Sequence, residues 1–365
     1  MLHRLAPLLK LVAATFLVLI LIDAVLFHSG VYTPVIKPDS TGGSVVGAMM
    51  AIDYYHDAAK KNVLVLGNSQ IGEGFSAELA DAQGVGPDIH FINGAAPGTT
   101  PRVWDYMLRE IDPERRRFSA IALMVDYDLD FTWTDLANYS LDLSYTTPML
   151  NLRDVRDFPK TFTDRALQGR ARRQILLPIQ ALHDDIQDLI ARPLRRIHDV
   201  NKVRPIWLGS LAIYGGRGGE LPPLAIDTQA AMPTSWGEFE TAWKPKLGPY
   251  FRDIRKAAPP ATRAANENYE RYWIARIAAH YRSVGVPVIV FNMARGPWKA
   301  QLLPSPAPNR VLAELRAAGD IVMLPGDAFI GLEKPEYFVD TLHLNSAGRE
   351  KFSKLFAAQV APLVH

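Results

Sequence analysis

The sequence contains no cysteine among its 365 residues, and it carries little net charge. The absence of thiols excludes disulfide bonds, thiolate metal sites and a cysteine nucleophile, but it leaves the cellular compartment open. Lys and Arg (40) nearly balance Asp and Glu (38), which gives a net charge of +2. Bulk charge therefore provides no reason to expect binding to nucleic acid or to an acidic polymer. No internal repeat is apparent.

A long apolar run is present near the N-terminus. Residues Leu11 to Phe27 are almost wholly apolar and are interrupted only by Thr15 and Asp23. As a helix with about 1.5 Å rise per residue, the run would span roughly 26 Å, slightly less than a typical hydrocarbon core. We interpret it as an uncleaved membrane anchor. The alternative is a cleaved signal peptide, for which Ile22-Asp23-Ala24 is a poor cleavage site.

Positive charge precedes the apolar run, at Arg4 and Lys10. This pattern predicts that the N-terminus lies in the cytoplasm and that the rest of the chain lies beyond the membrane. We therefore expect a single-pass protein of the inner (cytoplasmic) membrane with a periplasmic or extracellular domain. The predicted organisation is an anchor over residues 1–32, a juxtamembrane linker over 33–61 and an α/β domain over 62–365, with an insert at about 131–262.

Short apolar runs alternate with helix-forming stretches along much of the chain. Strands are expected at Asn62–Leu66, His90–Asn93, Ala120–Val125, Pro287–Asn292 and Ile321–Leu324. Helices are expected around Met49–Ala59, Ser76–Ala82, residues 101–110, Tyr269–Ser283, Asn309–Ala318 and Ala347–Val360. This alternation predicts an α/β fold with a doubly wound parallel sheet.

The insert does not continue the alternation and is expected to be largely helical. Between Arg165 and His198, apolar residues recur at helical spacing and arginines cluster near both ends. One interpretation is an amphipathic helix that covers the core with a solvated basic face. The other is a surface that faces anionic lipid or a partner protein. Gly209–Pro260, rich in Gly, Pro and Trp, is expected to be a long functional loop.

Three polar segments follow predicted strands or lie near the C-terminus. Ligands of open α/β sheets bind at the carboxyl ends of the strands, and Gly67–Gly72 directly follows the first strand. Ser69 in this segment is a candidate nucleophile beside helix N-terminal amides that could stabilise an oxyanion. The alternative is that Ser69 only caps the next helix.

The second segment is Asp340-Thr341-Leu342-His343. A serine nucleophile needs a base, and the base needs a carboxylate on its other ring nitrogen. Asp340, three residues before His343, can reach back to that nitrogen within one turn. The third segment, Asn93–Thr100, contains Gly98, whose amide can donate to an oxyanion, although an ordinary turn would have the same composition.

Together these segments resemble the SGNH (GDSL-like) hydrolase superfamily over roughly residues 62–128 and 269–360. The most specific piece is the D-x-x-H-L-N-x-x-G pattern that begins at Asp340. The resemblance implies an SGNH, flavodoxin-like sheet and a triad of Ser69, His343 and Asp340. It also implies oxyanion donors at the Ser69 and Gly98 amides.

The candidate oxyanion and substrate-binding positions are Gly98, Asn68, Asn93, Asp126 and Asp128. The chain departs from the family at two of these places. Asn68 stands where the family usually has aspartate, and Val125-Asp126-Tyr127-Asp128 stands where the family has G-x-N-D. Loss of the asparagine donor would cost a few kcal/mol in the transition state.

Similar architecture occurs in membrane-anchored envelope acyltransferases, such as alginate O-acetyltransferases and the teichoic acid D-alanine-transfer protein. The resemblance therefore implies transfer of an acetyl or D-alanyl group to or from an envelope polymer, beside a multi-pass membrane-bound O-acyltransferase. The alternatives are a carbohydrate or lipid esterase and a catalytically silent glycan-binding or scaffold subunit. No cofactor or metal is expected.

Overall fold

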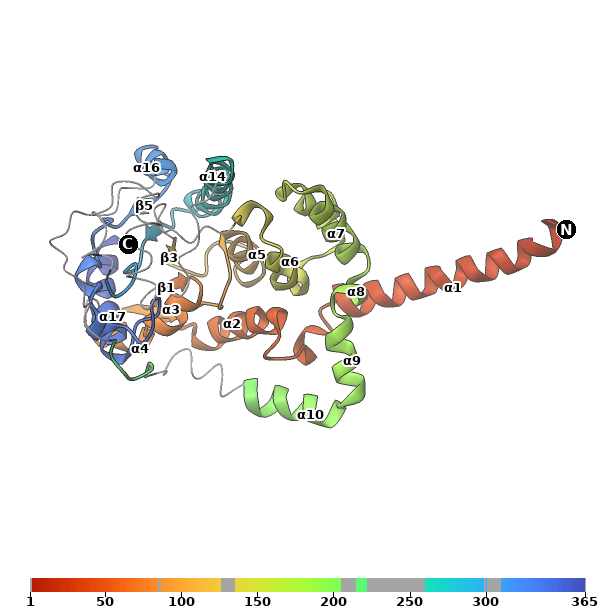
Figure 1. Cartoon of the computed structure of the whole chain (residues 1–365), viewed down its shortest axis with the longest axis horizontal. Helices are drawn as coiled ribbons and strands as arrows, with labels where there is room; N and C mark the ends of the chain where they lie inside the picture. The colour runs from red at the N-terminus through yellow and green to blue at the C-terminus, as the bar shows by residue number, and fades with distance from the viewer. Residues whose placement is uncertain are drawn as a thin grey trace, which may run out of the picture. The chain divides into compact units, whose positions relative to one another are not determined.

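The computed structural model describes residues 2–84, 86, 88–125, 135–204, 215–221, 260–298, 300 and 310–364 (Figure 1). The chain forms two compact units. The helical unit comprises Met1–Gly47 and Ala137–Trp207, and the sheet unit comprises Ala48–Leu136 and Leu208–His365. Two elements cross the boundary between them, α2 (Thr41–Tyr55) and the 3-10 turn η2 (Leu136–Asn138).

The helical unit is built from helices joined by short turns. Its helices are α1 (Leu2–His28), α6 (Leu141–Thr146), α7 (Arg165–Leu176), α8 (Pro178–Ala181), α9 (His183–Ala191) and α10 (Pro193–His198). The turns are η1 (Thr33–Val35), η3 (Thr147–Met149), η4 (Leu152–Val155), η5 (Phe158–Thr161) and the π-helical η6 (Asp199–Val203). The predicted helical stretch Arg165–His198 is thus divided, because Pro178 and Pro193 each start a new helix.

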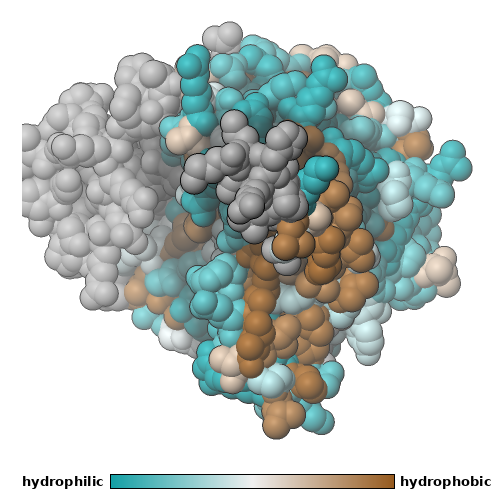
Figure 2. Space-filling view, turned by 90° about the vertical axis from the view of Figure 1, so that its right-hand side faces the viewer, coloured by the Kyte–Doolittle hydropathy of each residue, from teal (hydrophilic) through white to brown (hydrophobic). Residues whose placement is uncertain are grey.

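The apolar run near the N-terminus lies within α1, and many of its side chains are exposed (Figure 2). Over the part of the chain that the structure describes, no helix combines the length and apolar character needed to cross a bilayer. The end of α1 is fixed inside the helical unit by His28, whose two ring nitrogens lie 3.3 Å from Leu150 O and 2.9 Å from Ile175 O.

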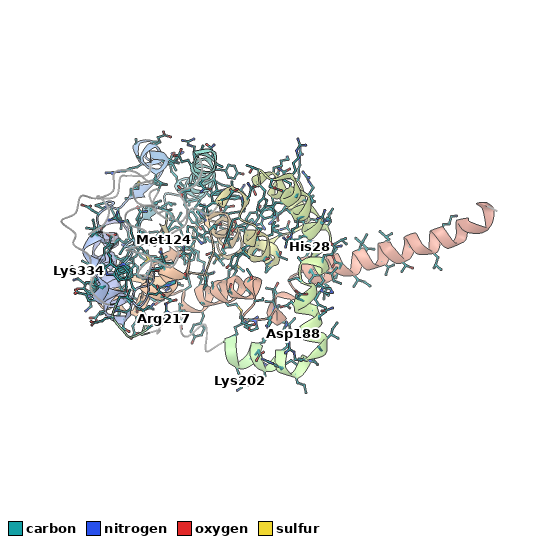
Figure 3. All side chains as sticks on the ribbon, viewed as in Figure 1. His28, Met124, Asp188, Lys202, Arg217 and Lys334 are labelled. Atoms are coloured by element: carbon teal, nitrogen blue, oxygen red, sulfur yellow. The ribbon has the colours of Figure 1, made fainter. Side chains whose placement is uncertain are left out.

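Residues 33–61, expected to form a linker, contain η1 and α2. Arg196 of α10 is buried and holds the start of this segment. Its guanidinium pairs with Asp185 and Asp188 at 2.8 Å each and donates to Val35 O at 2.9 Å (Asp188 is labelled in Figure 3). A second buried arginine, Arg204, donates to the carbonyls of Pro34 and Ile36.

The sheet unit contains five parallel strands in the order β2-β1-β3-β4-β5. They are β1 (Lys61–Leu66), β2 (Ile89–Asn93), β3 (Ala120–Met124), β4 (Val288–Phe291) and β5 (Val322–Met323). The predictions of an α/β fold and a parallel sheet are confirmed. In this doubly wound order the connections leave β1 and β3 in opposite directions, so the topological switch point, where such folds commonly bind ligands, lies between the carboxyl ends of β1 and β3.

The helices of this unit are α3 (Ser69–Gly74), α4 (Ala77–Asp81), α5 (Pro101–Ile111), α14 (Pro260–Arg282), α16 (Arg310–Ala317) and α17 (Ser346–Val360). The 3-10 turns among the described residues of this unit are η8 (Ile330–Leu332), η9 (Pro335–Tyr337) and η10 (Ala361–Leu363). The clearest differences from expectation are α3, where no helix was predicted, and α14, which begins nine residues before the predicted Tyr269.

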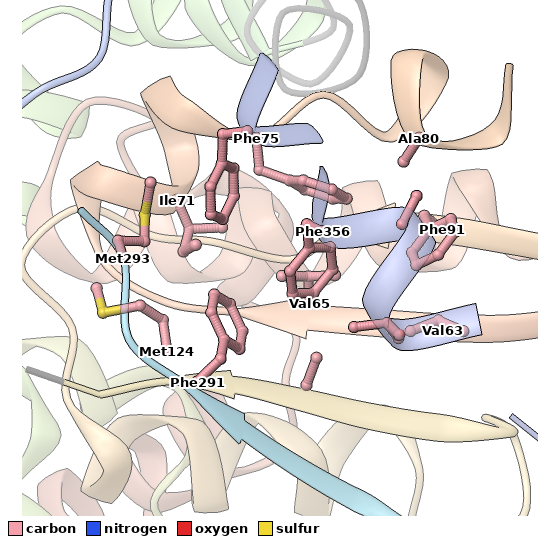
Figure 4. Packing of buried hydrophobic residues seen from close by; sticks show 14 of the residues in the cluster. Val63, Val65, Ile71, Phe75, Ala80, Phe91, Met124, Phe291, Met293 and Phe356 are labelled. Carbon is pink, nitrogen blue, oxygen red and sulfur yellow. The ribbon is translucent and has the colours of Figure 1, made fainter. Parts of the chain in front are cut away.

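One face of the sheet is covered by α17 through a cluster of aromatic rings (Figure 4). The Phe356 ring centroid lies 4.7 Å from that of Phe291 on β4 and 5.2 Å from that of Phe75 after α3. Phe91, Phe329 and Phe352 belong to the same cluster, and all six rings are buried. Burial of such side chains stabilises the fold by about 1.5–3 kcal/mol each, so α17 is fixed firmly beside the carboxyl ends of the strands.

Alternate strand residues point to the opposite face. There, Leu64 and Leu66 of β1 lie against α2, since a Cβ on Gly94 would meet both leucines and Ile52 within 3.0 Å. Helix α14 packs on β4 and on α5.

Candidate active site

Ser69 is placed by a tight turn at the carboxyl end of β1. Gly67 makes the turn possible, because a Cβ at this position would lie 2.3 Å from Ile71 Cγ1. Asn68 caps α3, and its side chain accepts a hydrogen bond from Gln70 N at 2.9 Å. Ser69 is therefore the first residue of α3 and not its cap, so its hydroxyl remains available for chemistry.

Asp340 and His343 are held in a compact turn before α17. Asp340 Oδ1 accepts hydrogen bonds from the amides of Leu342 at 2.9 Å and His343 at 2.7 Å. The ends of the turn meet in an antiparallel bridge between Phe338 and Leu344, both of which are buried. The aspartate is thereby fixed by its own backbone.

The turn brings His343 to Ser69, 274 residues away in sequence. His343 Nε2 lies 3.0 Å from Ser69 Oγ, and His343 Nδ1 lies 3.0 and 3.1 Å from the two Asp340 oxygens. Because a carboxylate only accepts, Nδ1 carries the proton, and the Nε2 lone pair faces the serine hydroxyl. This is the arrangement in which an imidazole removes a proton from a serine.

The Asp340 carboxylate stays ionised at neutral pH. Partial burial raises its pKa, but hydrogen bonds from the His343 and Leu342 amides and from the His343 ring outweigh that effect, so the pKa lies below its usual value. A negative charge next to Nδ1 stabilises the imidazolium that forms when His343 takes a proton.

Asn345 and Gly348, which follow His343 in the motif, have structural roles at the start of α17. Asn345 caps α17 by accepting from Gly348 N at 2.9 Å, and its Nδ2 donates to Gly219 O at 2.7 Å and Glu336 O at 2.8 Å. Gly348 has no room for a side chain, since a Cβ would lie 2.3 Å from Tyr337 O. The motif thus combines two reactive side chains with the cap that starts α17.

Two charged residues that the sequence did not indicate adjoin the triad. Arg217 (labelled in Figure 3) donates to Glu73 Oε2 at 2.7 Å and to Asp340 Oδ2 at 3.0 Å. Glu73 Oε1 lies 3.9 Å from His343 Nε2. Glu73 could have been found, because it lies one helical turn after Ser69. Arg217 belongs to the predicted loop Gly209–Pro260 and has no local sequence signal.

Segment 215–221, which contains Arg217, is attached by its backbone to residues on both sides of the Asp340–His343 turn. Arg217 O accepts from Ser346 N at 2.9 Å, and Leu221 N donates to Pro335 O at 3.2 Å. A Cβ on Gly216 would lie 2.9 Å from Ser346 Cα. The segment and the start of α17 are therefore closely fitted.

The loop after β2 lies beside the Ser69 turn. Ala96 N and the Thr99 hydroxyl both donate to Gly67 O at 3.2 Å, which places the loop of Gly98 next to the carboxyl end of β1. The Asn93 side chain is buried and donates to Phe75 O at 3.0 Å. Asn93 therefore connects β2 with the C-terminal end of α3, whereas Asn68 caps the N-terminal end of the same helix.

Two of the predicted positions, Asp126 and Asp128, lie outside the described residues. Immediately before them, Val125 O accepts from Asn292 Nδ2 at 2.8 Å, so an asparagine at the end of β4 lies beside β3. Within the described ranges, His, Asp and Glu side chains form no group of three or more that could hold a metal ion.

The triad geometry is the principal basis for interpreting this site. Comparison with known proteins does not assign the chain to a family, because no protein-family model and no curated protein match it.

Proposed function

We propose that this protein transfers an acyl group through a covalent intermediate on Ser69, as an SGNH-type enzyme. The observation that supports this proposal most strongly is the chain of hydrogen bonds from Asp340 through His343 to Ser69, with each link near 3.0 Å. This series of hydrogen bonds favours a reactive serine over a catalytically silent scaffold, because a scaffold would not need an aligned base and carboxylate.

In the first half-reaction, Ser69 Oγ forms a bond to the acyl carbon while its proton passes to His343 Nε2. Collapse of the tetrahedral intermediate breaks the bond from the acyl carbon to the leaving oxygen, and the imidazolium returns the proton to that oxygen. In the second half-reaction, an acceptor hydroxyl forms a bond to the acyl carbon while its proton passes to His343 Nε2. The bond from the acyl carbon to Ser69 Oγ then breaks, and the imidazolium returns the proton to Ser69 Oγ. Asp340 stays ionised throughout.

The developing oxyanion needs donors beside Ser69. We assign this role to the backbone amides of Ser69 and Gly98, from the SGNH resemblance and from the proximity of the Gly98 loop to Gly67. Each well-placed donor contributes roughly 3–4 kcal/mol to transition-state stabilisation.

The proposed setting is the bacterial envelope. The apolar run Leu11–Phe27, preceded by Arg4 and Lys10, serves as a single-pass inner-membrane anchor with the catalytic domain in the periplasm or outside the cell. Exposure of Leu17, Val18 and Val25 on α1 fits a helix surrounded by lipid. The acyl group is acetyl or D-alanyl, the acceptor or donor is an envelope polymer, and the partner is a multi-pass membrane-bound O-acyltransferase.

A second candidate function is hydrolysis of a carbohydrate or lipid ester. The His343 side chain is 18% exposed and that of Asp340 is 41% exposed, so water can reach the site. In that case water replaces the acceptor hydroxyl in the second half-reaction.

A fluorophosphonate probe tests the common step, because it phosphonylates only an activated serine. We expect one adduct per chain, located at Ser69 by peptide mass spectrometry and absent in Ser69→Ala. The matched control is Ser283→Ala, since Ser283 is exposed and its hydroxyl donates to the backbone oxygen of His280. Failure of the folded wild-type protein to react would contradict the proposal. Analysis of products from an acetyl ester and an envelope glycan then separates transfer from hydrolysis.

A further inference from the structure

The helical unit exposes large apolar side chains on neighbouring short helices. They are Leu176 at the end of α7, Ile179 of α8, Ile190 of α9, and Leu194 and Ile197 of α10. Leu194 is 81% exposed and Ile190 is 75% exposed. Single exposed apolar residues are common, but several on consecutive helices form the kind of patch that marks an interaction site.

This apolar surface continues onto α1. Helix α8 packs on α1, and Ile179 N donates to Asp23 Oδ1 at 2.9 Å. Around that junction, Ile22 and Val25 of α1 are also exposed. Figure 2 shows hydrophobic surface gathered beside α1 on this side of the molecule. Asp23, the one acidic residue in the apolar run, is therefore held by α8 through Oδ1, while its Oδ2 is buried without a hydrogen-bond partner among the described residues.

The same stretch is basic. Residues 165–198 contain seven arginines and three aspartates. Two of the aspartates, Asp185 and Asp188, are paired with the buried Arg196 inside the unit. The other six arginines are exposed: Arg165, Arg170, Arg172, Arg173, Arg192 and Arg195. Of these, Arg192 pairs with Asp188 and Arg195 with Asp199. The surface thus presents apolar side chains together with positive charge.

We propose that the face formed by the end of α7 and by α8, α9 and α10 lies in the headgroup region of an anionic bilayer. Side chains such as Ile190 and Leu194 enter the acyl boundary, while arginines contact lipid phosphates. Apolar burial and attraction to anionic headgroups are the two terms that hold interfacial helices on membranes. The inference rests on the proposed anchor, because α1 brings this face to the bilayer.

The absence of cysteine makes a direct test possible. Single variants Ile190→Cys and Leu194→Cys of the full chain are labelled with an environment-sensitive fluorophore. Each is reconstituted in phosphatidylcholine vesicles with about one quarter phosphatidylglycerol. We expect a blue-shifted emission and at least about two-fold quenching by spin-labelled lipid at both positions. Leu355→Cys on α17 is the matched control for an exposed apolar position in the sheet unit and should remain unquenched.

A probe at Val18→Cys in α1 separates this inference from the anchor. Quenching at residue 18 with aqueous emission at 190 and 194 would overturn the lipid-facing surface and leave the anchor intact. Aqueous emission at all three positions would overturn both. If the probes are shielded in native membranes but not in protein-free vesicles, the occupant is a protein and the lipid assignment fails.

Charge reversal tests the electrostatic part. Combined replacement of Arg170, Arg172 and Arg173 by glutamate should reduce quenching at residue 194 towards the Leu355 level, and added salt should reduce it in the unmodified protein. Arg196 is left in place because its replacement would unpair buried aspartates. Unchanged quenching in the folded variant would contradict the charge complementarity.

Discussion

Arg217 Nη2 donates to Asp340 Oδ2 at 3.0 Å, so a side chain from the long insert holds the carboxylate that orients the histidine. The same guanidinium binds Glu73 of α3, the helix that begins with Ser69. Arg217 thus connects both sides of the triad, and we regard it as a positioning residue.

Replacement of Arg217 should therefore impair catalysis more than folding. The side chain is 45% exposed, so its ion pairs contribute at most about 1 kcal/mol to stability. We expect Arg217→Gln to lower kcat about ten-fold with little change in KM, and Arg217→Lys to recover part of the loss. Arg316→Gln, at an exposed position on α16, should have no effect. Equal losses in the glutamine and lysine variants, or a loss confined to thermal stability, would contradict a positioning role.

Asp340→Asn should reduce kcat by about 10⁴-fold, because an amide donor opposite Nδ1 favours the wrong tautomer of His343.

The same variant should change the free energy of unfolding in a way that depends on pH. The pKa of Asp340 is lowered in the folded protein, so its stabilising effect is complete above its unfolded value of about 3.9. That effect disappears as pH falls through the lower folded value. Denaturation at several pH values should show a constant difference from wild type near neutrality and a shrinking difference only below about pH 3.9.

Gly348→Ala should destabilise the fold by about 1–3 kcal/mol, because the new Cβ would meet the backbone oxygen of Tyr337, which cannot move alone. Gly331→Ala is the matched control, since nothing lies within 4 Å of its Cβ position. Urea unfolding should show a change within about 0.5 kcal/mol for the control. Similar stability of the two variants would mean that α17 can shift away from Tyr337.

His90 should make stability depend on pH. Its ring nitrogens face two acceptors, Asp81 Oδ2 at 2.7 Å and Tyr55 O at 2.8 Å, so only the imidazolium satisfies both. The hydrogen bond to Asp81 raises the pKa of His90 against the effect of burial. Its stabilisation is therefore complete below about pH 6.5 and is lost as pH rises through the higher folded value.

Between pH values below about 6.5 and values above the folded pKa of His90, the free energy of unfolding should fall by about 1 kcal/mol. This decrease should be absent in His90→Gln and retained in the control His183→Gln, since the His183 side chain is 61% exposed. Thermal unfolding between pH 5 and pH 9 measures it. The same pH dependence in His90→Gln and wild type would refute the assignment.

Much of the sheet could be predicted because each strand is a short apolar run that ends at a turn residue. Asn62–Leu66 matches β1 except for one residue, since burial on both faces leaves a continuous apolar signal. The pairing of Ser69 with His343 was predicted on other grounds, because a serine nucleophile needs a base and Asp340 stands three residues before His343. The short helix α3 was missed because its capping residue, Asn68, is followed by only six helical residues.

Other features could not be predicted because they depend on distant contacts. The role of Arg217 depends on its hydrogen bonds to Asp340 and Glu73, which are 123 and 144 residues away in sequence. Arg196 and Arg195 are adjacent and chemically identical, yet one is buried among aspartates and the other is exposed. Helical spacing alone cannot tell which of them pairs inside the unit.

The separation of 274 residues between Ser69 and His343 has a consequence for biosynthesis. Chains emerge from the ribosome N-terminus first, at about 5–20 residues per second. The nucleophile is therefore made well before its base, and for that interval the hydroxyl is an ordinary, unactivated alcohol. The proposed reactivity therefore requires the turn before α17 to dock, so an unfinished chain would have no activated serine while it is being synthesised.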